Sequence, residues 1–220
     1  MAMLTNLDLM RRVPLFARLT VAQAEALSSA VVKRRYKRGE VLVAQGQKSD
    51  ALFLLLMGRA RVTASDSRGR EVILATLGQG DYLGEMSLID NEPHSATVRA
   101  EVQTDVLVLG RAEFTRCLLE NASMGLVLMR GLVKRLRQAD RKIESLALMD
   151  VYGRVARLLL DLAEDVDGHK VVTKKLTKQD IAKMIGASRE MVSRVMKDLQ
   201  QQGLIDEADG RIALGPELDA

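Results

Sequence analysis

Two stretches of this 220-residue chain carry polar and charged side chains at spacings that suit the binding of another molecule. The first is centred on Gly84 and Glu85. Gly84 permits a tight backbone path, and a short helical turn is predicted from Glu85 to Leu88. Exposed backbone amides at such a turn can hold an anionic oxygen, and the Glu85 carboxylate can accept hydrogen bonds from a sugar hydroxyl. The stretch could therefore bind a phosphorylated sugar.

The second stretch, residues 176–199, has the spacing of two helices joined by a tight turn. We expect Thr177 to cap the first helix, Gly186 to supply the turn and Ser188 to cap the second helix. The small Ala182 lies where the two helices would cross closely. The apolar face consists of Ile181, Ile185, Val192, Val195 and Leu199. This pattern predicts a helix-turn-helix, and residues 204–214, with an Asp-Gly turn, predict a wing hairpin after it.

Charge is unevenly placed around this motif. The whole chain has a net charge of +4, but residues 170–200 hold eight Lys or Arg against three acidic residues, a local charge of +5. Residues 201–220 hold one Arg against five acidic residues, a local charge of −4. A basic module in a nearly neutral chain is the electrostatic footprint of a nucleic-acid contact. A charged run alone is more often a solvated face, so the inference depends on the motif.

A long helix, predicted at residues 124–148, must connect the two stretches. Apolar residues recur along it at alternating spacings of three and four, which is the repeat of a two-stranded coiled-coil seam, and charged residues flank them. The seam consists of Met129, Leu132, Leu136, Ala139, Ile143 and Leu146. The alternative is an amphipathic helix lying on its own domain, but the apolar face is narrow for that role. The pattern favours a dimer axis that joins a sensor to an effector.

The chain before this helix has the pattern of short strands separated by glycines. Two short helices are predicted around Pro14, the second capped by Thr20, and another short helix at residues 111–120. The predicted strands are residues 31–36, 40–44, 51–57, 59–65, 71–77, 95–102 and 105–110. Many short strands with glycine turns predict an antiparallel barrel or sandwich.

Asp150 marks the predicted hinge between two domains. The first, residues 1–149, is the β-rich sensor with the dimerisation helix, and the second, residues 150–220, is the winged helix-turn-helix. In the second domain we expect a helix over residues 151–165, a polar loop to residue 170 and a strand at 170–175. The fold class is α+β.

Composition excludes several classes of protein. The single cysteine, Cys117, excludes an intramolecular disulfide and a protein-held iron–sulfur cluster, and suits a reducing cytoplasm. No apolar run approaches the roughly 20 residues that span a bilayer, and no secretion signal is present. We predict no metal site, because only two histidines exist. No enzyme activity is expected, since a P-loop and a paired nucleophile and base are missing, although a regulatory module that serves an enzyme is an alternative.

Residues 84–98 resemble the phosphate-binding cassette of the cyclic-nucleotide-binding β-roll, which has the form G-E-x-x-L…R-S/T-A-x-V. The matching residues are Gly84, Glu85, Leu88, Ser95, Ala96 and Val98. The resemblance implies a double-stranded β-helix of jelly-roll type. It implies ligand contacts at Gly84, Glu85, Met86, Ser87, His94, Ser95 and Ala96.

One residue departs from the cassette. The arginine that pairs with the cyclic phosphate in this family is His94 here. An imidazole near neutral pH is only partly charged and cannot offer a bidentate fork. The alternative is that His94 is a solvent-exposed turn residue beside a pocket without a ligand.

When the helix-turn-helix is included, the resemblance covers nearly the whole chain. The chain then resembles the bacterial transcription factors of the family of the cyclic AMP receptor protein and the fumarate–nitrate regulator (CRP/FNR). The family's recognition helix carries S-R-E-x-x-x-R, present here from Ser188 to Arg194. Arginine suits the O6/N7 edge of guanine, and glutamate suits the amino group of cytosine. The resemblance implies a palindromic, TGTGA-like operator and RNA polymerase as a partner. The expected DNA-binding residues are Thr177, Lys178, Ser188, Arg189, Glu190, Ser193, Arg194 and Lys197, of which Ser193 and Lys197 would contact phosphate.

The family also closes its ligand pocket with residues of the long helix. Aligning on a resemblance to the family hinge at residues 146–154 places Ala139 and Asp140 where the cyclic AMP receptor has two hydroxyl residues that reach adenine. Asp140 could instead accept from the N1–H and N2–H₂ edge of guanine, and Arg137 completes an R-x-x-D pattern that recurs in cyclic di-GMP sites. We therefore predict a homodimeric transcription factor that favours cyclic di-GMP over cyclic AMP. Charged residues that flank a coiled-coil seam are expected even where no ligand binds. The alternative is therefore a family member that binds DNA without a nucleotide.

Overall fold

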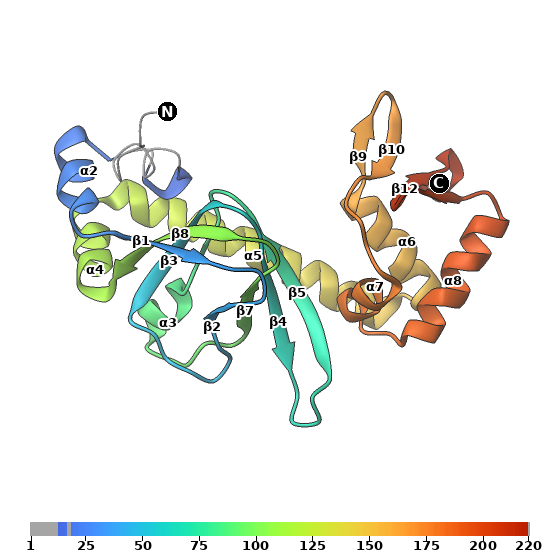
Figure 1. Ribbon diagram of the computed structural model, residues 1–220, viewed down its shortest axis with the longest axis horizontal. Helices are drawn as coiled ribbons and strands as arrows, with labels where there is room; N and C mark the ends of the chain where they lie inside the picture. The colour runs from blue at the N-terminus through green and yellow to red at the C-terminus, as the bar shows by residue number, and fades with distance from the viewer. Residues whose placement is uncertain (1–12, 17–18, 220) are drawn as a thin grey trace. The chain divides into compact units, whose positions relative to one another are not determined.

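The computed structural model describes residues 13–16 and 19–219 (Figure 1). Contacts divide the chain into two compact units, the first ending at Arg135 and the second beginning at Leu136. The division falls inside the long helix α5 (Ala122–Leu148), and the domain boundary at residue 149 stays a prediction. The first of the two predicted N-terminal helices lies largely outside the described residues. The short 3-10 helix η1 (Pro14–Phe16) is described.

Two four-stranded antiparallel sheets form the first unit, with strand orders β1-β8-β3-β6 and β2-β7-β4-β5. All seven predicted strands are confirmed to within two residues at each end, and the two-residue strand β6 is an addition. The strands are β1 (Val32–Tyr36), β2 (Val41–Val43), β3 (Ala51–Met57), β4 (Ala60–Ser65), β5 (Glu71–Leu77), β6 (Tyr82–Leu83), β7 (Thr97–Ala100) and β8 (Thr104–Gly110).

Strand β3 is buried on both faces, which explains its continuous apolar sequence. Leu52 and Leu54 face one hydrophobic cluster, to which the helices contribute. Phe53 and Leu55 face the other cluster, which lies between the two sheets. Successive side chains of a strand point to opposite faces, so β3 joins the two cores.

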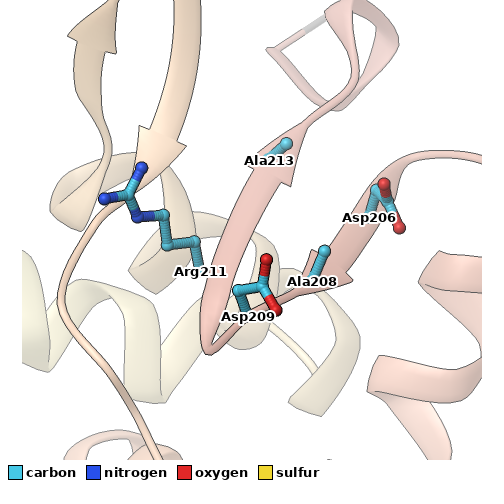
Figure 2. A pocket seen from close by; sticks show the side chains of 5 residues that line it. All are labelled: Asp206, Ala208, Asp209, Arg211 and Ala213. Carbon is cyan, nitrogen blue, oxygen red and sulfur yellow. The ribbon is translucent and has the colours of Figure 1, made fainter.

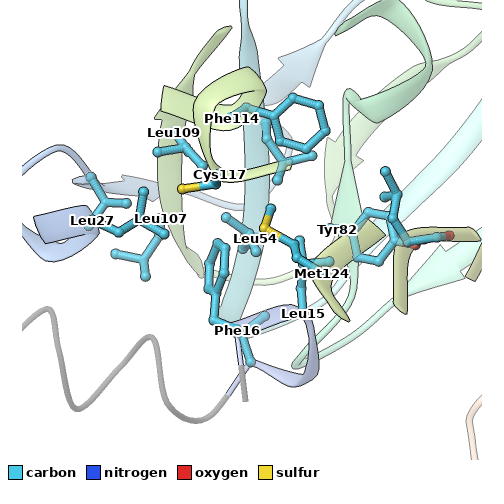
Figure 3. Packing of buried hydrophobic residues seen from close by; sticks show 14 of the residues in the cluster. Leu15, Phe16, Leu27, Leu54, Tyr82, Leu107, Leu109, Phe114, Cys117 and Met124 are labelled. Carbon is cyan, nitrogen blue, oxygen red and sulfur yellow. The ribbon is translucent and has the colours of Figure 1, made fainter. Parts of the chain in front are cut away.

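Helices cover the outer face of the β1-β8-β3-β6 sheet. They are α2 (Val21–Ser28), capped by Thr20 as predicted, and α4 (Arg111–Glu120), together with the first turns of α5. Phe16, Leu27, Phe114 and Met124 pack here against strand residues such as Leu54 (Figure 3). Burial of these large side chains is the main force that holds the start of α5 on the sheet.

The second unit begins with the end of α5 and continues with α6 (Val151–Leu162), capped by Asp150. The helix predicted over residues 151–165 is too long, because Glu164–Val166 form strand β9, which pairs with β10 (His169–Val172). The predicted loop is in fact the tight turn of this hairpin, where Asp167 and Gly168 have φ of 54° and 81°. Two successive positive φ values are typical of a two-residue hairpin turn.

The rest of the second unit matches the predicted winged helix-turn-helix. It comprises α7 (Lys178–Ile185), α8 (Arg189–Gln201), β11 (Ile205–Ala208), β12 (Arg211–Leu214) and the 3-10 helix η2 (Pro216–Asp219). The sheet order is β11-β12-β10-β9. A separate core contains the predicted Ile181, Ala182 and Val192, which are buried between α6, α7 and α8.

Candidate nucleotide cassette and nucleic-acid interface

The predicted cassette is a compact turn between β6 and β7 in the first unit. Gly84 has a φ of +91°, and a Cβ at this position would lie 2.5 Å from the Ala51 carbonyl oxygen. Only glycine tolerates both conditions. Helix α3 (Glu85–Asp90) follows, slightly longer than the predicted turn, and ends at Asn91 with a φ of 61°.

Glu85, at the start of α3, is held by an arginine of α5. Arg135 donates to Glu85 Oε1 at 2.5 Å and to the Tyr82 carbonyl at 2.5 Å, and its guanidinium lies 4.8 Å from the centre of the Tyr82 ring. The other carboxylate oxygen, Oε2, is buried and has no hydrogen-bond partner among the described residues. Burial raises the pKa of the Glu85 carboxyl, and Arg135 opposes that rise. No local sequence pattern indicates this contact, because residues 85 and 135 are distant along the chain.

Arg111, at the start of α4, holds the other end of α3. Its Nη1 donates to the Leu88 carbonyl at 2.9 Å and its Nη2 to the Ser87 carbonyl at 3.3 Å. Its Nε donates to Asp50 Oδ1 at 2.9 Å. The Ser87 carbonyl also accepts from the Asn91 amide, whereas the Leu88 carbonyl lies in the last turn, where a helix cannot pair its own acceptors, and Arg111 supplies a donor for it. Arg111 therefore fixes the cassette helix to α4, a role that the sequence pattern did not indicate.

His94 is buried, so the alternative of a solvent-exposed turn residue is wrong. Its Nε2 lies 2.8 Å from Ser49 Oγ, and its backbone bonds the chain at Gln47 and Gly46. Burial lowers the pKa of the imidazole and favours the neutral form. His94 is thus poorly suited to replace a charged arginine at a phosphate.

The other predicted ligand residues differ in exposure. Ser87 and Ala96 are buried, whereas Met86 and Ser95 are exposed. Arg137 and Asp140 are exposed on the part of α5 that belongs to the second unit. The cassette residues belong to the first unit, so a role for Arg137 and Asp140 in ligand binding stays a prediction.

The predicted seam of α5 is largely exposed in the single chain. Met129, Leu136, Ile143 and Leu146 are between 55% and 64% exposed. Leu126 and Val133 are exposed as well, although the heptad pattern did not include them. Such a row of apolar side chains on one helix is costly in water unless another surface covers it.

Helix caps position the two helices of the DNA-binding motif. The Thr177 hydroxyl accepts from the Asp180 amide, and the Asp180 carboxylate accepts from the Thr177 amide, a reciprocal capping box. Gly186 has a φ of 66° and ends α7. The Ser188 hydroxyl accepts from the Met191 amide at 3.2 Å and starts α8. The predicted caps and turn are therefore confirmed.

Helix α8 presents its predicted reading residues to solvent. A shallow surface depression is lined by Arg189, Glu190, Ser193 and Arg194, and Lys197 is exposed further along the helix. Hydrogen bonds from its own amide and from Ser188, with Arg189 and Arg194 nearby, lower the pKa of the Glu190 carboxyl and keep it ionised. An ionised acceptor beside two arginines can bond the donor and acceptor edges of base pairs.

A second depression lies on the wing hairpin and is lined by Asp206, Ala208, Asp209, Arg211 and Ala213 (Figure 2). On strand β11, next to these residues, Glu207 forms an ion pair with Lys178 at 3.7 Å. A predicted DNA-binding lysine thus already has an acidic neighbour.

Within residues 13–16 and 19–219, no three His, Cys, Asp or Glu side chains are grouped so that they could hold a metal ion. None of the helices that the structure describes is both long and apolar enough to cross a membrane.

Two family models match the chain, one in each unit. The cyclic nucleotide-binding domain matches residues 33–121, and the Crp-like helix-turn-helix domain matches residues 153–215.

Several known proteins are similar over most of their length. The cAMP-activated global transcriptional regulator Vfr of Pseudomonas aeruginosa is 36% identical over 183 residues, which cover 79% of this chain and 84% of Vfr. The cAMP-activated global transcriptional regulator CRP of Salmonella typhimurium is 34% identical over 178 residues, which cover 78% of this chain and 83% of CRP. The solved structure of the c-di-GMP responsive global regulator CLP of Xanthomonas campestris matches with a TM-score of 0.76 and 26% identity, covering 89% of this chain and 99% of CLP.

Proposed function

Since the chain belongs to the CRP/FNR family of transcription regulators, we propose that it is a homodimeric, ligand-responsive transcription factor that binds a palindromic, TGTGA-like operator. The observation that carries this proposal is the capped helix-turn-helix, whose Arg189, Glu190 and Arg194 face solvent beside one another. The proposal includes RNA polymerase as a partner and a cytoplasmic location. The similar proteins Vfr and CRP are transcriptional regulators by name, which supports regulation over enzymatic catalysis.

The exposed row on α5 supports the homodimer. Its apolar side chains recur at spacings of three and four residues, so a second copy of the same helix can cover them in a coiled-coil seam. A symmetric dimer also presents two recognition helices to two half-sites whose centres lie one helical turn of DNA apart, about 34 Å.

For the effector, we infer that a guanine-containing cyclic nucleotide, first of all cyclic di-GMP, binds more tightly than cyclic AMP. His94 is buried and its pKa is lowered, so it supplies less positive charge for a cyclic phosphate than an arginine would, and Ala139 supplies no hydroxyl for adenine. Loss of two such bonds, each worth roughly 1–3 kcal/mol, weakens binding by roughly 1.5 to 4 decades. Asp140 and Arg137 offer partners for a guanine edge. The similar regulator CLP is c-di-GMP responsive by its description, whereas Vfr and CRP are cAMP-activated.

The unpartnered Glu85 Oε2 supports a ligand contact at the cassette. A buried carboxylate oxygen without a partner is unfavourable, and a ribose hydroxyl could satisfy it. Arg135 occupies only the other oxygen, so both contacts can coexist.

Arg135 also favours a second candidate function, which is DNA binding without any nucleotide. Arg135 already ties α5 to the cassette by hydrogen bonds to Glu85 and Tyr82. If this contact suffices to hold the dimer helix, a ligand adds little to operator affinity.

Isothermal titration with cyclic di-GMP and cyclic AMP, each at pH 6 and pH 8, tests these proposals. We expect tighter binding of cyclic di-GMP and, because burial lowers the pKa of His94, only a small difference between the affinities at the two pH values. Asp140→Ala should remove the preference, whereas Glu144→Ala, a matched change on the same helix, should keep it. Tighter cyclic AMP binding would contradict the guanine argument, and affinity that falls with rising pH would restore a charged His94 to the site. If neither nucleotide binds but operator binding persists, the second candidate is correct.

A further inference from the structure

The wing places a carboxylate beside a lysine that we expect to contact the DNA backbone. Lys178 is the first residue of α7, and its Nζ lies 3.7 Å from Glu207 Oε2 on β11. The two side chains are 44% and 37% exposed, so both ends of the pair reach solvent. An incoming phosphate can therefore meet the same ammonium group that the carboxylate holds.

The register of the hairpin explains why Glu207, among the wing's acidic residues, forms this pair. Glu207 lies opposite the buried Ile212 and two residues after the buried Ile205. Alternate residues of a strand share a face, so Glu207 lies on the side of the hairpin that carries the core residues. Asp206 lies on the other side, opposite Ala213 (Figure 2).

We propose that Glu207 competes with the DNA backbone for Lys178 and so holds the operator affinity of this chain below the value that its helix-turn-helix alone would give. The inference rests on the proposed DNA-binding function. A lysine that neutralises a phosphate releases counterions, so each freed Lys178 adds affinity and salt dependence. Phosphates carry no sequence information, so the gain applies to every DNA sequence alike.

The test compares Glu207→Gln with Asp206→Asn in the full-length chain. Both variants remove one negative charge from adjacent positions of the same strand, but only the first breaks the ion pair. Fluorescence anisotropy measures binding to a duplex with the TGTGA palindrome and to a scrambled duplex, between about 50 and 200 mM salt.

We expect Glu207→Gln to tighten binding of both duplexes by the same factor, about fivefold for a dimer with two freed lysines. The slope of log K against log salt should steepen by about 0.9 for each added phosphate contact. Asp206→Asn should give a much smaller change. In a Lys178→Met background the gain from Glu207→Gln should disappear. Circular dichroism confirms that each variant is folded, and Glu207→Ala repeats the test with a shorter side chain.

Equal effects of Glu207→Gln and Asp206→Asn would overturn the proposal, because the negative charge of the wing as a whole, and not the ion pair with Lys178, would then explain the gain in affinity. A gain that persists without Lys178, or no gain at all, would overturn it as well. A wild-type chain that does not prefer the palindrome over the scrambled duplex is a different result, which contradicts the proposed operator recognition itself.

Discussion

Replacing Arg135 with glutamine should destabilise the first unit by about 1–3 kcal/mol. The Glu85 side chain is only 2% exposed, so the variant leaves a buried carboxylate without its cation. Removing one partner of a fully buried pair costs about 3–5 kcal/mol. The Arg135 side chain is 36% exposed, so solvent screening reduces the expected loss of stability to about 1–3 kcal/mol.

The stability lost in Arg135→Gln should depend on pH, and the direction of this dependence follows from the pKa of the Glu85 carboxyl. Burial raises the pKa of this carboxyl, and Arg135 is the attraction that opposes the rise. Without Arg135 the pKa in the folded state moves further above its value in the unfolded chain. The folded state then binds more protons than the unfolded state, so stability falls as pH rises from about 4.3 through the raised pKa. The deficit of Arg135→Gln should therefore be smaller at pH 5 than at pH 8.

Urea unfolding followed by circular dichroism at both pH values measures this deficit. Arg130→Gln is the matched control, because Arg130 is an exposed arginine on the same helix. The double variant Glu85→Gln/Arg135→Gln removes the buried charge and should recover part of the loss. If Arg135→Gln and Arg130→Gln unfold alike at pH 8, the Glu85 contact does not hold α5 on the cassette.

Three further predictions concern the other contacts. Leu136→Asp should put two charges into the seam and leave monomers that no longer bind the operator, and a full dimer by light scattering would show that the seam is misassigned. Arg194→Ala should cost about 1–3 kcal/mol of operator binding and relax the preference at one guanine, while Lys197→Ala weakens all sequences alike. An unchanged sequence preference in Arg194→Ala would place that residue elsewhere. Arg111→Gln should loosen α3 and weaken nucleotide binding by about 1–2 kcal/mol relative to Arg116→Gln on the same helix, and equal affinities in calorimetry would remove Arg111 from its positioning role.

Much of the fold was predictable from local signals. The continuous apolar run of β3 and the caps Thr20, Thr177 and Ser188 fix elements within a few residues of themselves. Gly186 marks the turn of the helix-turn-helix because a left-handed backbone there favours glycine. Such signals depend only on neighbouring residues, so the sequence pattern contains them.

The errors concern interactions between distant or competing elements. Helix α6 is shorter than predicted because residues 164–166 leave the helix and form strand β9, whose backbone pairs with β10. The contacts of Arg135 with Glu85, and of Arg111 with the carbonyls of α3, join residues that no local pattern relates. His94 shows the same limit, since its burial beside Ser49 depends on how the loops pack.

Binding of the palindrome is the most direct test of the central claim. Fluorescence anisotropy of the wild-type chain should be measured against a TGTGA palindrome and a scrambled duplex at about 150 mM salt, with and without cyclic di-GMP. In the nucleotide state that supports binding, the wild-type chain should bind the palindrome at least about 10³-fold more tightly than the scrambled duplex. Equal affinities for the two duplexes in both states would contradict this claim.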